Sequence, residues 1–177
     1  SGYKVTVYDV NDEALNKAKN RFDVLAEEYK NYLKADEEKI ENTKNNLTYS
    51  TELMSSLQDA DLLIEAVPES IDIKKDFWEK ASEHAPEKTI FASNSSTLLP
   101  SRLSTFTDRP EKFIHLHFAN HIMVRNMAEI MGSDQTDPTV YNEIVEFAKS
   151  IAMLPVELKK EKSGYVLDSL LIPLLVA

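Results

Sequence analysis

The feature that most constrains the fold of this chain is a repeated alternation of short apolar runs with longer segments of helical periodicity. Runs rich in β-branched and aromatic residues predict strands at residues 4–9, 47–49, 61–67, 89–93, 112–118, 127–131 and 154–158. The runs at residues 4–9 and 61–67 are predicted to be buried strands. Helices are predicted at residues 11–33, 36–46, 51–57, 71–85 and 138–151. Such an alternation predicts a doubly wound, mostly parallel α/β sheet.

Capping residues support two of these helices. Asn11 or Asp12 suits the cap of the first long helix, and Asp137 followed by Pro138 suits the start of the last one before residue 151. From Ser163 onward the pattern changes, because apolar residues cover a wide face of a predicted helix over residues 163–177. We therefore expect one α/β domain over residues 1–160 and the start of a helical domain at residues 163–177.

Charge and composition exclude several classes of protein. Twenty Lys plus Arg against 30 Asp plus Glu give a formal net charge of −10, which disfavours binding to nucleic acid. Without Cys the chain has no disulfide, no thiolate metal site and no cysteine nucleophile. No apolar run approaches the ~20 residues of a membrane span, and the first residues carry no signal peptide pattern. We expect a cytoplasmic protein that binds neither nucleic acid nor a membrane.

Polar residues follow several predicted strands, and ligands of open α/β sheets bind at these carboxyl ends. Asp9 is the first of them. An acid at this position either binds the ribose hydroxyls of a dinucleotide or caps the helix that follows. The glycine-rich phosphate loop expected about 20 residues before such an acid is missing, because only eight residues precede Asp9. The sequence looks as if it begins inside a Rossmann domain, after its first strand and helix.

Residues 93–97 form an unbroken run of Ser, Asn and Thr after a predicted strand. Such a run suits a plain turn, or a loop whose hydroxyls hold a substrate oxygen. No base and no glycine elbow accompanies these serines, so serine hydrolase chemistry is disfavoured.

Three of the four histidines lie within residues 115–121. His115 and His117 share a face of the predicted strand, which suits either a metal site or one base oriented by a carboxylate, with Asn120 binding substrate. The third interpretation is that these histidines lie in an edge strand and have no function. Glu129 is a lone acid in an apolar strand and needs a buried partner, which His117 on an adjacent strand would provide. No cysteine or clustered carboxylate supports a metal, so we favour the base.

Five short blocks combine these residues. They are Glu65-Ala66-Val67-Pro68-Glu69, Ser93-Asn94-Ser95-Ser96, His117-Phe118-Ala119-Asn120, Ala128-Glu129-Ile130 and Gly164-Tyr165-Val166. In order and spacing the chain resembles L-3-hydroxyacyl-CoA dehydrogenases over essentially its whole length. The resemblance implies a Rossmann-type NAD-binding domain, a helical dimerisation domain from residue 163, an acyl-CoA thioester substrate, a homodimer, and a place in fatty-acid or butanoate metabolism.

The resemblance also implies a role for each matching residue. His117 matches the base that takes the proton from the substrate 3-hydroxyl, and Glu129 matches the carboxylate that orients the imidazole. Ser96 and Asn120 match residues that hold the 3-oxygen and the thioester region. Matching positions at the cofactor and coenzyme A side of the cleft are Asp9, Ala66, Val67, Glu69, Lys74, Asn94, Ser96 and Asn120.

The chain departs from the family pattern at several positions. His121 stands where the family has Pro, His115 where it has Gly, and Asp168 where it usually has Asn. Asp168 adds a negative charge near the expected cleft. Two alternatives therefore stay open: a dehydrogenase of the same fold that acts on a small hydroxy acid, and a catalytically silent binding fragment. A contact between Lys74 and coenzyme A would argue against the first.

Overall fold

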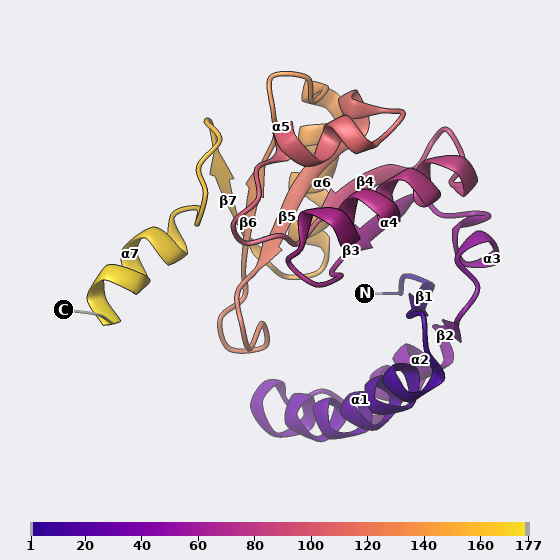
Figure 1. Cartoon of the computed structure of the whole chain (residues 1–177). Helices are drawn as coiled ribbons and strands as arrows, with labels where there is room; N and C mark the ends of the chain where they lie inside the picture. Colours follow the sequence, from indigo (N-terminus) through magenta and orange to yellow (C-terminus); the bar gives the residue numbers. More distant parts are fainter. Residues whose placement is uncertain (1, 176–177) are drawn as a thin grey trace. The chain divides into compact units, whose positions relative to one another are not determined.

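The computed structural model describes residues 2–175, and the chain divides into two compact units, Ser1–Asp59 and Ala60–Ala177. Figure 1 shows the helices and strands of both units along the chain. The two compact units do not test the predicted domains at residues 1–160 and 163–177, which stay a prediction.

The first unit is a parallel pair of strands with three helices. Strand β1 (Val5–Tyr8) pairs in parallel with β2 (Leu47–Ser50). The helices are α1 (Asp12–Leu33), α2 (Glu37–Asn45) and α3 (Leu53–Leu57). Asn11 caps α1, since its side chain accepts a hydrogen bond from the Ala14 N–H at 2.7 Å. The structure thus selects Asn11 over Asp12 as the cap.

The prediction that residues 4–9 form a buried strand is wrong. All four residues of β1 are exposed or half-buried, and Val5 is 46% exposed. The apolar run indicated burial on both sides, but β1 and β2 form a sheet of only two strands, so each strand has a hydrogen-bonded neighbour on one edge only.

The second unit contains a five-stranded sheet in the order β3-β4-β5-β6-β7. Its strands are β3 (Leu62–Glu65), β4 (Ile90–Ser93), β5 (Phe113–Phe118), β6 (Met127–Met131) and β7 (Leu154–Leu158). All neighbours pair in parallel except β5 and β6, which are antiparallel. The predicted mostly parallel α/β sheet is confirmed. The third run is only partly buried, with Ile64 40% exposed, because β3 is an edge strand.

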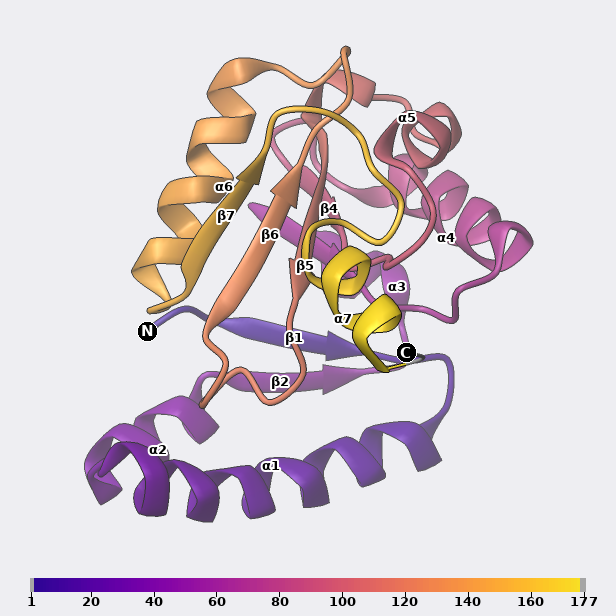
Figure 2. The same ribbon diagram turned by 90° about the vertical axis from the view of Figure 1, so that its left-hand side faces the viewer.

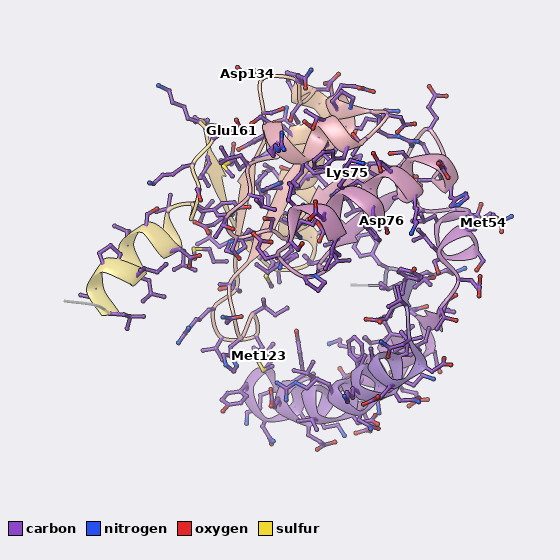
Figure 3. The ribbon with its side chains drawn as sticks, in the orientation of Figure 1. Met54, Lys75, Asp76, Met123, Asp134 and Glu161 are labelled. Atoms are coloured by element: carbon purple, nitrogen blue, oxygen red, sulfur yellow. The ribbon has the colours of Figure 1, made fainter. Side chains whose placement is uncertain are left out.

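Helices cover both faces of this sheet, as the sequence pattern predicted. Figure 2 shows α6 (Pro138–Ser150) on one side, with α4 (Ile71–His84) and α5 (Pro100–Leu103) on the other. Two short 3-10 helices, Ser104–Phe106 and Pro110–Lys112, lead into β5. Charged residues occupy the outer surface of α4, where Figure 3 labels Lys75 and Asp76. The inner surface of the same helix packs on the sheet.

Alternate residues of the strands form two separate cores. On the α6 side, Ile114, Leu116 and Ile130 pack against Ile144 and other buried residues of the helix. On the opposite side an aromatic group lies under α4, where the ring centroid of Trp78 is 5.1 Å from that of Phe91 and 5.0 Å from that of Phe113. Because side chains alternate along β5, this second face also carries His115 and His117.

The last helix begins later than the sequence suggested. Helix α7 runs over Leu167–Leu175, and the predicted end at Ala177 lies outside the described residues. Gly164 and Tyr165 have φ values of 74° and 48°, so the backbone turns through the left-handed region before the helix can start. Leu170 and Leu174 are 70% and 75% exposed. Between residues 2 and 175 there is no helix that is long and apolar enough to cross a membrane.

Candidate active site

The centre of the site is a buried pair formed by His117 and Glu129. The antiparallel register of β5 and β6 places these two residues directly opposite each other. Glu129 Oε2 lies 3.0 Å from His117 Nδ1, and both side chains are buried. The prediction that neighbouring strands bring the acid to the imidazole is confirmed. With Nδ1 engaged by the carboxylate, Nε2 is the ring nitrogen left for chemistry.

The second oxygen of Glu129 is also fully used. The backbone N–H groups of Val166 and Leu167 donate to Oε1 at 3.0 and 2.9 Å. These amides belong to the turn that opens α7, where the helix dipole favours negative charge. A buried carboxylate needs such hydrogen-bond partners, because an unpaired polar atom away from water is costly. The family block at residues 164–166 is the one sequence signal that pointed to these donors.

Ser96 occupies the other side of the imidazole. Its Oγ lies 3.2 Å from His117 Nε2, and it follows β4 in the polar run at residues 93–97. The structure therefore brings together three predicted site residues, Ser96, His117 and Glu129, in a continuous hydrogen-bonded chain. That chain lies at the carboxyl ends of β4 and β5, where ligands of α/β sheets bind.

Glu69 organises the loop that carries Ser96. Its Oε1 accepts hydrogen bonds from Ser95 Oγ at 2.6 Å, the Thr97 N–H at 2.9 Å and Thr97 Oγ1 at 2.8 Å. Burial opposes ionisation of this group, but the hydrogen bonds from Ser95 and Thr97 and the charge of Lys74 outweigh it and lower the pKa of Glu69 to about 2. Glu69 is therefore ionised at neutral pH, and its carboxylate holds the loop in place.

Lys74 is engaged in the interior of the unit. Its side chain is 1% exposed, and Nζ lies 2.5 Å from Glu65 Oε1, 3.2 Å from the Val67 carbonyl and 3.4 Å from Glu69 Oε2. The other oxygen of Glu65 accepts a bond from Ser93 Oγ at 2.7 Å. The predicted contact of Lys74 with coenzyme A or cofactor stays untested. In the observed geometry Lys74 binds Glu65 at the end of β3, and Glu65 in turn binds Ser93 at the end of β4, which the position of Lys74 in the sequence did not reveal.

The remaining predicted positions of this unit lie at the same end of the sheet. Asn94 Oδ1 accepts the Phe118 N–H at 2.9 Å and so joins the ends of β4 and β5. Ala66 and Asn120 are exposed, and Val67 is half-buried. Small and amide-bearing residues at the carboxyl ends of parallel strands suit the rings and ribose of a dinucleotide. These residues fit NAD.

Asp9 belongs to the first unit and makes a local contact there. Its Oδ1 accepts a hydrogen bond from the Asn11 N–H at 3.2 Å, just after the end of β1. Asn11 makes the helix cap that the sequence offered as the alternative role of Asp9, so Asp9 makes this turn contact instead. The side chain is only half-buried, so its role toward a ribose stays a prediction.

The alternative interpretation of the histidines as a metal site has no supporting cluster in the part of the chain that the structure describes. Among residues 2–175 no group of three or more His, Asp or Glu side chains is arranged to hold an ion. His115 Nδ1 lies 2.7 Å from the Tyr165 hydroxyl, and His117 Nδ1 faces Glu129. Each imidazole is thus hydrogen-bonded to a different partner.

A mostly parallel α/β sheet with polar side chains gathered at the carboxyl ends of its strands is typical of Rossmann-type dehydrogenase domains. Residues 1–162 match the family described as 3-hydroxyacyl-CoA dehydrogenase, NAD binding domain. The chain belongs to this family. Its cofactor is therefore NAD.

Individual relatives agree with this assignment. The chain is 29% identical over 181 residues to the human mitochondrial hydroxyacyl-coenzyme A dehydrogenase, covering 99% of this chain and 57% of that protein. It is 35% identical over 126 residues to a 3-hydroxybutyryl-CoA dehydrogenase of Clostridioides difficile, covering 71% of this chain and 44% of that one. The chain thus spans about half the length of these relatives.

A solved structure of a diketoreductase, described for dual catalysis of dicarbonyl compounds, is also similar. It has a TM-score of 0.95 and 54% sequence identity, and the match covers 98% of this chain and 62% of that chain. The structure of a (S)-3-hydroxybutyryl-CoA dehydrogenase from Ralstonia eutropha matches with a TM-score of 0.91 and 25% identity, over 98% of this chain and 60% of that chain. Both acyl-CoA and dicarbonyl substrates thus occur among similar proteins.

Proposed function

We propose that this chain is the NAD-binding and proton-transfer part of an oxidoreductase that interconverts an L-3-hydroxyacyl-CoA and the corresponding 3-ketoacyl-CoA. The observation that carries the proposal is the hydrogen-bonded chain from Ser96 through His117 to Glu129. A neutral imidazole held by a carboxylate is suited to move a proton in either direction near neutral pH.

In the oxidation direction, His117 Nε2 takes the proton from the 3-hydroxyl. Nδ1 keeps its proton and donates a hydrogen bond to Glu129, so the imidazolium forms beside a negative charge rather than alone in a buried site. Bound NAD would supply the acceptor for the hydride of the carbon that bears this hydroxyl. Removing the proton as the hydride leaves lets the carbonyl form without a free alkoxide.

Ser96 and Asn120 are proposed to hold the substrate. Ser96 Oγ lies within hydrogen-bonding distance of the same Nε2 that receives the proton, so an oxygen bound by Ser96 lies near the base. Asn120 lies two residues beyond the end of β5, which places it at the same end of the sheet. These contacts would keep the 3-oxygen oriented during proton transfer.

We propose cofactor contacts at positions that the family resemblance indicates. In the second unit these are Ala66, Val67, Glu69, Lys74, Asn94, Ser96 and Asn120. Lys74 and Glu69 would act through the loops that they hold, since the ammonium of Lys74 is buried. Asp9 of the first unit would accept hydrogen bonds from the adenosine ribose.

Dicarbonyl reduction is the second candidate, and the 54% identity to a diketoreductase favours it. The same residues would run in reverse, with a protonated His117 donating to the ketone oxygen as hydride arrives. The two candidates share the reaction centre and differ in the rest of the substrate. The small hydroxy acid alternative belongs to this second class, because it too lacks coenzyme A.

Steady-state kinetics on the intact protein separate these candidates. NADH consumption is measured with a 3-ketoacyl-CoA and with a free dicarbonyl compound of matching acyl length. The proposal expects the thioester to have the higher kcat/KM. A free dicarbonyl that is at least as good would transfer the assignment to the second candidate, and no turnover of either would overturn both.

We also propose a homodimer that uses α7. Leu170, Leu174 and Leu175 are largely exposed on this helix, and contiguous apolar surface of this kind marks an interaction site.

A further inference from the structure

Tyr165 lies against the proposed base and is fully buried. Its ring is stacked on the imidazole of His117, with centroids 4.4 Å apart and an angle of 13° between the planes. A stacked neighbour restricts rotation of the imidazole about its side-chain bonds. The electron-rich face of a phenol also stabilises a positive charge placed over it.

The hydroxyl of Tyr165 makes two hydrogen bonds, one as donor and one as acceptor. It donates to the Ser95 carbonyl at 2.6 Å. Since a phenol has one proton, its 2.7 Å contact with His115 Nδ1 requires the imidazole to be the donor. His115 thus carries its proton on Nδ1 and anchors the tyrosine hydroxyl together with the Ser95 carbonyl.

The environment keeps both members of this contact neutral. Burial, with a further contribution from the charge of Lys74, lowers the pKa of His115 to about 3. Burial also raises the pKa of the Tyr165 phenol, and the negative charge of Glu129 adds to this effect. At neutral pH the donor and acceptor roles are therefore constant.

The backbone at Tyr165 links the stack to the carboxylate. Its φ of 48° is a conformation that a bulky residue rarely adopts, so the surrounding contacts must hold it there. The next two N–H groups, of Val166 and Leu167, donate to Glu129. One turn of chain thus places a ring on His117 and two amides on its partner carboxylate.

We propose that Tyr165 is a positioning residue for His117, and that His115 and the Ser95 carbonyl hold its ring in place. The inference rests on the proposed function, because it assumes that His117 is the base. It assigns a use to His115, which stands where the family resemblance expects glycine. The charged groups that act on Tyr165 and His115 are Glu129 on β6, Glu65 on β3, Lys74 on α4, Glu69 before α4 and Asp168 on α7.

Two substitutions of Tyr165 separate the ring from the hydroxyl. Tyr165→Leu removes the stack, and we expect kcat to fall about 10-fold while KM changes less than about 2-fold, because the base is misoriented and its charged form is less stable. In the oxidation direction the acid limb of the kcat–pH profile should move to lower pH by about 0.5, since the imidazolium loses its proton more readily. Tyr165→Phe keeps the ring and should lower kcat much less than Tyr165→Leu does, by about 2- to 3-fold.

A double-mutant cycle tests the anchor without removing the ring. Tyr165→Phe and His115→Leu should each lower kcat by about 2- to 3-fold, and the double variant should be no worse than the poorer single one. Tyr141→Phe is the matched control, because it removes a hydroxyl that bonds the Ile130 and Leu158 carbonyls of the same unit. The control should leave kcat and the pH profile unchanged.

Failure of this inference is distinguishable from failure of the proposed function. The inference is overturned if folded Tyr165→Leu keeps the wild-type kcat and acid limb while His117→Ala loses activity. It is also overturned if the losses in the cycle simply multiply. Should Tyr165→Leu not fold, the cycle decides by itself. Full activity of His117→Ala would instead overturn the proposed function.

Discussion

The carboxylate of Glu129 lies 3.0 Å from His117 Nδ1 because two antiparallel strands hold these residues in register. A shift of one residue between the strands would turn the acid to the opposite face of the sheet. The α6-side core of Ile114, Leu116 and Ile130 resists such a shift, since it would expose apolar side chains. The packing of one face therefore maintains the chemistry of the other.

Replacing the acid by its amide tests the orienting role. We expect Glu129→Gln to lower kcat by about 10²-fold or more, because the imidazolium loses its counter-charge and the preferred tautomer of His117 is no longer enforced. An assay of the intact protein with NAD measures this. Glu157→Gln, on the neighbouring strand β7, is the control and should keep wild-type activity. Little change in kcat for Glu129→Gln would contradict the assigned role.

The half-buried carboxylate of Asp9 predicts a preference for NAD over NADP. A 2′-phosphate near this side chain would meet a like charge, so kcat/KM should be higher with NAD. Asp9→Ser should reduce that preference, whereas Asp12→Ser, in the first turn of α1, should not. Equal preference in wild type and Asp9→Ser would leave the turn contact with Asn11 as the whole role of the residue.

Burial of His115 predicts a specific dependence of stability on pH. Its pKa is about 3 in the folded protein against 6.5 for an exposed imidazole, so below pH 6.5 the unfolded chain takes up a proton that the folded chain refuses. Stability contributed by this group is complete above 6.5 and falls as the pH drops toward 3, by at most about 1.4 kcal/mol per pH unit. Urea unfolding between about pH 6.5 and 5 measures this slope, a window chosen to lie above the ordinary carboxyl range.

His115→Gln removes the titrating group and should flatten that slope whatever it does to stability at pH 7. His121→Gln changes an exposed histidine and should leave the slope as in wild type. An unchanged slope in His115→Gln would show that its imidazole is not held neutral in the folded protein.

The exposed leucines of α7 predict self-association. Leu170→Glu together with Leu174→Glu places two charges on the face proposed for the homodimer, so the oligomer measured by light scattering should dissociate toward the monomer. Replacing Lys159 and Lys160 near the end of β7 by Gln changes the net charge by the same amount elsewhere and should not have this effect. An oligomer that survives the α7 changes would place the interface on another surface.

Periodicity and capping predicted most of the elements of the fold, since Pro138 after Asp137 and the apolar alternation are local signals. The pairing of His117 with Glu129 was also within reach, because a lone acid in an apolar strand requires a partner. The turn at Tyr165 was not, because its left-handed φ depends on hydrogen bonds made after folding. Nor did the sequence reveal that Lys74 is buried against Glu65, since only tertiary packing removes an ammonium from water.

The same limit explains the exposure of β1. Val5 and Val7 are side chains that a strand can bury. Whether they are buried depends on how many strands lie beside β1 in its sheet. Local sequence carries no information on that number.

The most direct test of the account is turnover by His117→Ala compared with His115→Ala and His121→Ala in the intact protein. If His117 is the base, its loss lowers kcat by about 10²-fold or more with little effect on NAD binding measured by titration, and the other two variants are much milder. Equal losses in His115→Ala and His117→Ala, or activity restored by added zinc, would contradict the account in favour of a metal site.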